Sequence, residues 1–326
     1  MRASNFKNLS KSSTSTIYQS YNWQKLYREA FDSKPFFITI TDDSGNVVGQ
    51  LACLIHEKML WAGTNPVSKK IGNLFKLNKS LWWYHGPIIH SHDNEDEILS
   101  IILSTVDKIA KKNQVVNIRG ISSPFAKQFP VKLFKKYNYV SESRLTFIID
   151  LNQDLDELYN SLKKDTRYYI RKSEKKEFEF KIASNVDSME RFQDLKFESK
   201  KREGEKPFRN LPFWKKHWKI MKNNGFEELV TAEYKNKIEG TILVLFFNGN
   251  MIQHALANSP EKDLVGTFLT WNTIKWAQKM KFKTFDFAGV DPLPKTKKEK
   301  GIYFYAEKFG GKKINFFSYS KILNQK

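Results

Sequence analysis

The sequence predicts a mixed α/β (α+β) protein built from two tandem domains of similar build. Helical and strand periodicities are interleaved along the chain, and this mixed pattern restarts near residues 150–155. The 326 residues are enough for two ordinary domains, and 40% hydrophobic residues supply each with a core. We therefore expect a disordered tail at 1–16, a first domain over 17–150 and a second over 151–326.

A β-hairpin and a long helix are the clearest elements of the first half. Strands are expected at Phe36–Thr41 and Val47–His56, joined by a turn of Asp, Ser, Gly and Asn at 42–46. Residues Glu95–Lys112 carry apolar side chains at helical spacing. Further expected elements are a helix at Trp23–Phe31, strands at Leu81–Tyr84, Val115–Ile118 and Leu145–Leu151, and a short helix at Phe134–Tyr137.

The second half begins with one apolar helical face between Leu155 and Ile170. A three-strand meander follows at Leu229–Tyr234, Ile238–Phe247 and Met251–Ala257, with polar turns between the strands. The remaining expected elements are a strand at Phe178–Ile182, helices at Ser188–Lys201, Phe213–Asn223 and Thr267–Met280, strands at Lys283–Phe287 and Ile314–Ser318, and a polar loop at Asp291–Lys300.

The charge favours an anionic partner without naming it. With 55 Lys and Arg against 35 Asp and Glu, the net charge of +20 attracts polyanions, although a lysine-rich proteome gives the same bias. The single Cys53 cannot form an internal disulfide, which fits a reducing compartment. The first residues lack an apolar signal core and no stretch is long enough to span a bilayer. We expect a cytoplasmic protein, and a monomer.

Two basic groups are candidate anion sites. Lys163, Arg167, Arg171 and Lys175 recur every four residues and form a stripe on one helix, which is either a phosphate-binding surface or a solvated face. Arg202 and Arg209 lie in a basic segment between two helices, where arginines suit bidentate phosphate binding. The alternative for this second group is a basic surface loop.

Asp286 and Gly289 follow the strand Lys283–Phe287, and α/β proteins place ligands at the ends of such strands. Gly289 lets a substrate approach the backbone closely, whereas Asp286 equally suits a turn residue that caps local amides. Lys308 precedes a pair of glycines that could cradle an anion, but the segment lacks the spacing of a nucleotide-binding phosphate loop.

A metal site is not expected. His85, His90, His92 and Asp93 lie close together in the sequence, but their spacing matches no standard zinc pattern and no thiol assists them. The chain also lacks a serine-hydrolase elbow and a dinucleotide-binding glycine loop. We therefore expect no tightly bound metal or cofactor, so that any activated group would arrive on a co-substrate.

Taken in order, these segments resemble the FemABX peptidyltransferase family, which sits in the GNAT superfamily beside BioF2-like acyltransferases. The matching segments, each moderately specific, are Tyr84–Pro87, Leu145–Leu151, Leu162–Phe180 with Arg167, Ile170 and Arg171, Arg202–Gly204, Phe285–Val290 and Gly301–Gly311. The resemblance covers most of the chain and implies two GNAT-like (acyl-CoA N-acyltransferase-like) domains. No helical-hairpin insertion is present in the sequence, so no long coiled-coil arm is expected.

The resemblance implies transfer of an activated acyl or aminoacyl group, from aminoacyl-tRNA or acyl-CoA, onto an amine of a phosphate-bearing acceptor such as a cell-wall precursor. In that reading Arg202 and Arg209 bind the acceptor phosphate, with help from Arg167 and Arg171. Asp286 orients or deprotonates the amine. The family's lysine aligns with Ala306, which leaves Lys308 as its substitute and puts the exact reaction in question.

Two alternatives remain open. The first is a CoA-dependent GNAT N-acyltransferase, although the candidate pyrophosphate turn Asp263–Gly266 holds a single glycine. The second is a non-catalytic protein that binds RNA or another polyanion, which the net charge would serve. The ordered site motifs favour the transferases. Neither the donor nor the acceptor follows from the sequence.

Overall fold

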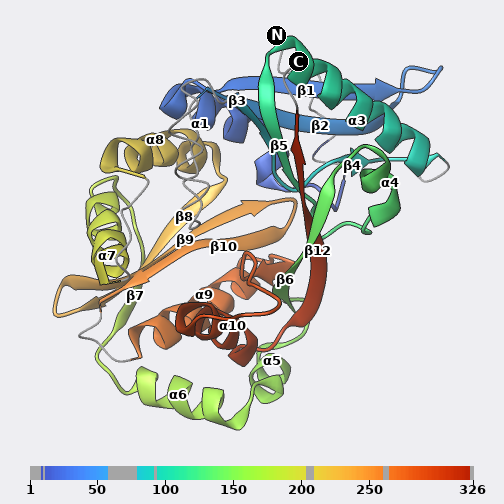
Figure 1. The fold of residues 1–326 in the computed structure, drawn as a ribbon. Helices are drawn as coiled ribbons and strands as arrows, with labels where there is room; N and C mark the ends of the chain where they lie inside the picture. Colours follow the sequence, from blue (N-terminus) through green and yellow to red (C-terminus); the bar gives the residue numbers. More distant parts are fainter. Residues whose placement is uncertain are drawn as a thin grey trace. The chain divides into compact units, whose positions relative to one another are not determined.

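The computed structural model describes residues 9, 12–57, 79–91, 94–202, 209–259 and 264–323, and the chain forms two compact units. Unit 1 comprises Met1–Arg144 and Asn315–Lys326, and unit 2 comprises Leu145–Ile314. Each unit combines helices with strands (Figure 1). The sequence boundary was drawn at residue 150, with residues 315–326 in the second domain. They join unit 1 instead because the last strand pairs with a strand of that unit.

Unit 1 is a mixed sheet with the strand order β1-β2-β3-β5-β12. The hairpin partners β1 and β2 are antiparallel, as are β2 and β3 and also β5 and β12, whereas β3 and β5 are parallel. A two-residue strand, β4, pairs with β2. The strands are β1 (Lys34–Thr41), β2 (Val47–His56), β3 (Lys79–Trp83), β4 (Ile88–Ile89), β5 (Val115–Ile121) and β12 (Lys312–Ile322), which begins in unit 2.

The core of unit 1 lies between this sheet and its long helix. Helix α3 (Glu95–Lys112) presents Leu99, Ile102 and Val106, all 0% exposed, and the short helix α4 (Val131–Lys136) adds Phe134. Strand β2 alternates, so that Cys53 joins this core while His56 meets Tyr27 of α1 (Tyr21–Phe31). The hairpin and the helix α3 are confirmed: β2 and α3 have the predicted bounds, and β1 begins two residues earlier, at Lys34.

The end of the predicted tail is ordered where the structure describes it. Ser15 and Thr16 are 0% exposed, the Ser15 hydroxyl donates to the Leu9 carbonyl at 2.6 Å, and Ser123 donates to the Thr14 carbonyl at 2.9 Å. A 3-10 turn, Ile17–Gln19, then leads into α1. Residues 1–8 and 10–11 lie outside the described part. The expected disorder is therefore corrected for residues 12–16, because their polar groups find partners within unit 1.

Unit 2 has the strand order β6-β11-β10-β9-β8-β7. Its pairs are antiparallel except β10 with β11, which run parallel. The strands are β6 (Val140–Asp150), which begins in unit 1, β7 (Glu179–Ile182), β8 (Glu227–Tyr234), β9 (Lys237–Phe247), β10 (Asn250–Asn258) and β11 (Thr284–Asp286). The meander expected from the sequence is therefore confirmed as β8, β9 and β10.

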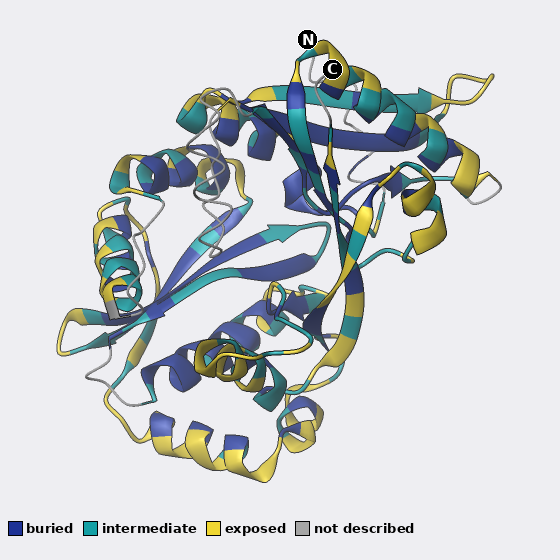
Figure 2. Cartoon of the chain, in the orientation of Figure 1, coloured by how far each residue is buried: buried dark blue, intermediate teal, exposed yellow. Residues whose placement is uncertain are grey.

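Helices cover both faces of the unit 2 sheet (Figure 1). One face packs against α9 (Val265–Lys279), and α7 (Ser188–Arg202) packs on the other, beside α8 (Leu211–Met221). Both faces are therefore apolar: Val230 and Val244 face the α9 side, and their neighbours Leu229 and Leu243 are also 0% exposed. Dark buried strands between partly exposed helices show this layering in Figure 2.

Two features of unit 2 differ from the sequence prediction. The apolar face of 155–170 is divided between α5 (Leu155–Ser161) and α6 (Lys164–Glu174), because Leu162 is extended with ψ 148°. The polar loop at 291–300 ends early, since Thr296 caps a helix that was not predicted, α10 (Lys297–Lys308). Thr296 and Glu299 form a reciprocal capping box, a signal present in the sequence. Among the described helices the longest is α3, with 18 residues, and no long helical arm is seen.

Candidate active site

The candidate site lies in unit 2, where the two parallel strands separate. Strands β10 and β11 pair over three residues, from Asn250 with Thr284 to Ile252 with Asp286, and no further. On its other side β10 continues beside β9, but the register shifts between Gln253 and Ala255, which makes His254 a bulge residue. Ligands of α/β proteins bind at the carboxyl ends of strands where neighbours diverge, so this point is the natural place for chemistry.

Asp286 ends β11 and is 1% exposed. Its Oδ1 accepts hydrogen bonds from the Thr146 hydroxyl at 2.5 Å and from the Ala288 amide at 2.9 Å. The other oxygen, Oδ2, has no hydrogen-bond partner in the part of the chain that the structure describes. Burial raises the pKa of Asp286 to about 6, against the lowering effect of those two hydrogen bonds. A carboxyl that titrates near neutrality can accept or donate a proton at the pH of the cell.

The backbone after Asp286 makes a tight turn that Thr146 fixes. Ala288 and Gly289 both have positive φ, 65° and 89°. The Gly289 amide donates to the Thr146 hydroxyl oxygen at 3.1 Å, and the Val290 amide donates to the Leu145 carbonyl of β6. Asp286 and Gly289, which the sequence placed together at the end of one strand, both bond to Thr146. Oδ1 of Asp286 therefore caps a turn, as the alternative from the sequence proposed, whereas Oδ2 takes no part in the turn.

Lys308 lies against the first turn of α9, the helix that follows β10. Its ammonium donates to the Thr267 hydroxyl at 3.0 Å and sits over the rings of Tyr305 and Phe309, 4.6 and 5.0 Å from their centroids. Burial lowers the pKa of Lys308 to about 8. A helix N-terminus and a lysine together form an anion-binding position, since both present positive charge to the same place.

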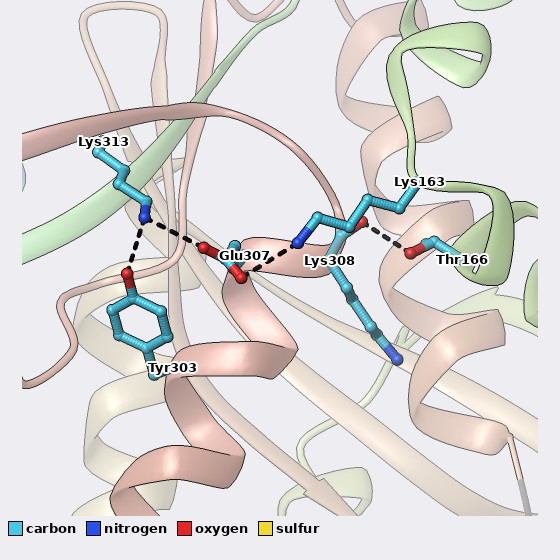
Figure 3. A network of polar contacts seen from close by, with 6 residues as sticks. All are labelled: Lys163, Thr166, Tyr303, Glu307, Lys308 and Lys313. Atoms are coloured by element: carbon cyan, nitrogen blue, oxygen red, sulfur yellow. Dashed lines mark hydrogen bonds and ion pairs between the residues drawn. The ribbon is translucent and has the colours of Figure 1, made fainter.

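Helix α10 is anchored so that Lys308 reaches α9. The Tyr305 hydroxyl donates to the Gly266 carbonyl at 2.8 Å and shares a 2.5 Å hydrogen bond with Thr270. On the opposite side, the Thr166 hydroxyl of α6 donates to the Lys308 carbonyl at 2.9 Å, as Figure 3 shows. These bonds hold the last turn of α10 in place, from which the Lys308 ammonium reaches Thr267.

Glu307 joins two lysines beside this turn (Figure 3). Its carboxylate contacts Lys163 at 3.2 Å and Lys313 at 3.1 Å, and Lys313 also donates to the Tyr303 hydroxyl at 2.8 Å. The Lys308 side chain extends away from this network in Figure 3. Lys163, part of the predicted basic stripe, is therefore paired with an acid and ties α6 to α10.

Arg167 and Arg171 are turned toward α5. One Arg167 nitrogen donates to the carbonyls of Asn160 at 2.8 Å and Leu162 at 2.6 Å, which closes the end of α5. Arg171 donates to the Tyr159 hydroxyl at 3.1 Å. These contacts give Arg167 a structural role at the α5–α6 break.

Arg209 lies on the α8 side of the sheet, next to the bulge of β10. Its guanidinium is 3.4 Å from Nε2 of His254 and lies over the rings of Phe213 and Trp214. Arg202 is the last residue of α7, and its side chain lies outside the described residues, as do Glu203 and Gly204. The structure therefore places one of the two proposed phosphate-binding arginines beside the strand that carries the bulge.

The sequence reasoning missed a polar group that accompanies Arg209. His254 stacks on His217 of α8, with ring centroids 5.8 Å apart, and Nδ1 of His217 contacts the Glu227 carboxylate of β8. His217 and Glu227 are both 0% exposed. The sequence did contain a signal: Glu227 in β8 and His217 in α8 are titratable residues among apolar ones, a pattern that a purely apolar core does not produce.

Among the described residues, no group of three or more His, Cys, Asp and Glu side chains is arranged to hold a metal ion. His85 is buried, and burial lowers its pKa to about 3, while His90 contacts Gln50 at 3.0 Å. His92 and Asp93 lie outside the described residues. Within the same part of the chain, no helix is both long and apolar enough to cross a membrane.

Comparison with known proteins assigns the second half of the chain. The acetyltransferase (GNAT) domain family matches residues 160–297, which include β10, α9 and β11. A search of curated proteins found no match.

The solved structure of FemX is similar over 100% of this chain and 97% of that chain, with a TM-score of 0.75 and 15% identity. A tandem GNAT protein from the clavulanic acid biosynthesis pathway has a TM-score of 0.58 at 8% identity, covering 100% and 98% of the two chains. L-PGS from Bacillus licheniformis has a TM-score of 0.54 at 10% identity, covering 93% and 91%.

These findings confirm the predicted fold class and the predicted resemblance. The family match spans the separating strands and the helix between them, and the FemX likeness extends that fold over the whole chain. Residues 160–297 thus match a GNAT acetyltransferase domain, and over the whole chain the fold is similar to that of FemX and of a tandem GNAT protein.

Proposed function

We propose that this protein transfers an activated acyl or aminoacyl group onto an amine of a phosphate-bearing acceptor, such as a cell-wall precursor. The observations that carry the proposal are that β10 parts from β11 after Ile252 and that Lys308 contacts Thr267 in the first turn of α9, the helix that follows β10. We assign this helix end, which suits an anion, and the titratable carboxyl of Asp286 at the end of β11 to one site.

The donor is the ligand that we assign to the α9 side. Aminoacyl-tRNA and acyl-CoA both carry a reactive acyl group on a phosphate-bearing carrier, and both therefore suit the N-terminus of α9 and Lys308. The acceptor phosphate is assigned to Arg209 on the α8 side, together with Arg202 from the end of α7. Such donors are made in the cytoplasm, where we place the reaction.

Alignment of the two substrates supplies much of the catalysis in this proposal. An amine held against an activated acyl group reacts as if at very high local concentration. The turn at Ala288 and Gly289 follows the point where the strands part, and Asp286 Oδ1 and the Thr146 hydroxyl fix it by accepting hydrogen bonds from its two amides. Oδ2 of Asp286 remains able to orient the amine. Lys308 takes the place of the family lysine, whose position is filled by Ala306, 2% exposed.

The test is a transfer assay on the full chain with acetyl-CoA or charged tRNA as donor and a nucleotide-linked peptidoglycan precursor as acceptor. Product with charged tRNA, lost in Lys308→Ala and with a raised acceptor KM in Arg209→Ala, supports the proposal. Arg28→Ala, an exposed arginine at the end of α1, is the matched control. Near wild-type rates in Lys308→Ala, Asp286→Asn and Arg209→Ala together would remove this site.

The CoA-dependent reading is the second candidate, because the family that matches residues 160–297 is described as an acetyltransferase. Calorimetry separates the two donors: saturable micromolar binding of acetyl-CoA with weak salt dependence favours CoA. A preference for charged over uncharged tRNA favours aminoacyl transfer. A protein that only binds RNA is the less favoured alternative, because the family that matches residues 160–297 is one of transferases.

A further inference from the structure

The buried polar group on the α8 side of unit 2 has no part in the function proposed above beyond Arg209. Glu227 and His217 are both 0% exposed and touch each other, and the ring of His217 stacks on His254 at an interplanar angle of 27°. His254, in contrast, is partly exposed and occupies the bulge of β10. The His254 imidazole is therefore backed by a buried imidazole–carboxylate pair.

The buried pair of Glu227 and His217 is not expected to stabilise the fold more than apolar side chains would. Taking a carboxylate out of water costs several kcal/mol, on the order of what its partner returns, and an apolar pair of similar volume would stabilise the fold at least as well. Buried titratable clusters at strand ends are for this reason candidates for function. Aromatic side chains surround part of this group, with Phe213 and Trp214 near the ring of His217.

Position along the strands brings His254 to the reaction point. Ile252 is the last residue of β10 to pair with β11, and its partner is Asp286. Two residues further along each strand are His254 and Ala288, the residue whose amide bonds to Asp286. His254 thus follows the last paired residue of β10, as the turn at Ala288 follows the last paired residue of β11.

The charges around His254 keep it neutral. Burial, followed by Arg209, His217 and Lys196, holds the pKa of His254 well below its usual value. Glu227, the acid in the group, contacts His217 rather than His254. A neutral imidazole is a proton acceptor, and the nearby guanidinium of Arg209, 3.4 Å away, favours rapid release of any proton that the ring takes up.

We propose that His254 transfers the proton from the acceptor amine to the leaving group, and that His217 and Glu227 position it. As the amine nitrogen bonds to the acyl carbon, His254 takes a proton from that nitrogen. The bond from the acyl carbon to the ester oxygen, or to the thioester sulfur, then breaks, and the leaving atom receives the same proton. The products are an amide and the deacylated carrier, with no other reagent consumed.

This inference rests on the proposed function, and its test separates the two. We expect His254→Ala to lower kcat at least about 100-fold with little change in donor KM, the size of effect that a general base supplies. Added imidazole should restore part of the lost rate. Glu227→Gln should lower kcat less, about tenfold, also at unchanged donor KM. His90→Asn, a partly buried histidine of unit 1, is the matched control.

Three results decide the matter. If the wild type transfers and His254→Ala does so within about threefold of its rate, the relay is overturned while the proposed function stands. If kcat falls and imidazole rescues it, the relay is supported. If the wild type transfers nothing, the proposed function fails, and NMR titration of the His254 imidazole then tests the arrangement. A His254 pKa near 6.5 that does not change in Arg209→Gln overturns the arrangement. A neutral His254 whose pKa rises in Arg209→Gln supports it.

Discussion

Asp286 and Lys308 in unit 2 have shifted pKa values, and the contacts of each side chain explain its shift. Asp286 is buried with one oxygen engaged, so its pKa is raised to about 6, whereas Lys308 is buried against aromatic rings and its pKa is lowered to about 8. Both shifts bring the pKa of the group closer to neutral pH. Neither could be known from the sequence, because residue type says nothing about how much water a side chain has lost.

The first prediction concerns the free energy of unfolding and Asp286. Its pKa is about 6 in the folded state against 3.8 for an unperturbed aspartate, so the unfolded chain releases this proton at lower pH than the folded chain does. Wild-type stability should therefore fall as the pH rises through this window. Asp286→Asn removes that loss, and between about pH 4 and about pH 7 it should gain up to roughly 3 kcal/mol relative to the wild type. Denaturant melts at several pH values measure this, and parallel curves would contradict it.

The second prediction concerns donor binding and Lys308. The cation is present below its pKa of about 8, so donor affinity should weaken as the pH rises through that value. Lys308→Ala should lower the affinity about tenfold at neutral pH, the scale of one charge-assisted hydrogen bond, and should abolish the pH dependence. Calorimetry across this range measures both effects. Lys279→Ala, an exposed lysine at the far end of α9, should bind like the wild type.

At the scale of elements, the break between α5 and α6 determines what the basic stripe can do. The sequence left open whether this stripe, Lys163, Arg167, Arg171 and Lys175, binds phosphate or is a solvated face of one helix. The chain instead turns at Leu162, and the Arg167 guanidinium closes the exposed carbonyls of α5 at 2.6 and 2.8 Å. Four-residue spacing predicted which side chains share a face. Only the packed structure shows that Arg167 donates hydrogen bonds to carbonyls of the preceding helix end.

The third prediction follows from this contact. Arg167→Ala should lower the free energy of unfolding by about 1–2 kcal/mol, because two carbonyls at the end of α5 lose their donor. The kinetic constants for donor and acceptor should change little. Thermal melts and transfer kinetics on the same protein separate the two effects. A raised acceptor KM with unchanged stability would instead return Arg167 to the phosphate site.

On the scale of the whole molecule, the C-terminal strand determines how the chain divides. Residues Asn315–Lys326 belong to unit 1, where Tyr319 is 1% exposed and stacks on Phe134 at 3.6 Å between ring centroids. A linear reading of the sequence assigned these residues to the domain that precedes them. The return of the last strand to the first unit is a long-range pairing, which local patterns do not encode.

The fourth prediction uses that strand. Tyr319→Ala should lower the stability of unit 1 by about 3–5 kcal/mol, the usual cost of truncating a buried aromatic side chain. Unit 2 should keep its stability, since Tyr319 lies in the unit 1 core. Hydrogen exchange of amides in β2 and in β9 reports the two units separately. Equal loss of protection in both would show that the units unfold together.

The sequence by itself determined the fold class, most of the elements and the family resemblance. Alternation, helical spacing and turn residues are local properties, so the hairpin, α3 and the β8–β10 meander were predicted well. Motif order identified Asp286, Gly289 and Lys308 as residues worth testing; the Gly289 amide bonds to Thr146, and the Lys308 ammonium bonds to Thr267 in the first turn of α9.

Only the tertiary structure decided which polar groups meet. Helix α10 was missed because its capping box lies in a segment read as a polar loop, and α10 is what brings Lys308 to α9. The contacts among Glu227, His217 and His254 join residues from β8, α8 and β10. Contacts between residues far apart in the sequence arise from strand register and helix packing, and no single stretch of sequence contains that information.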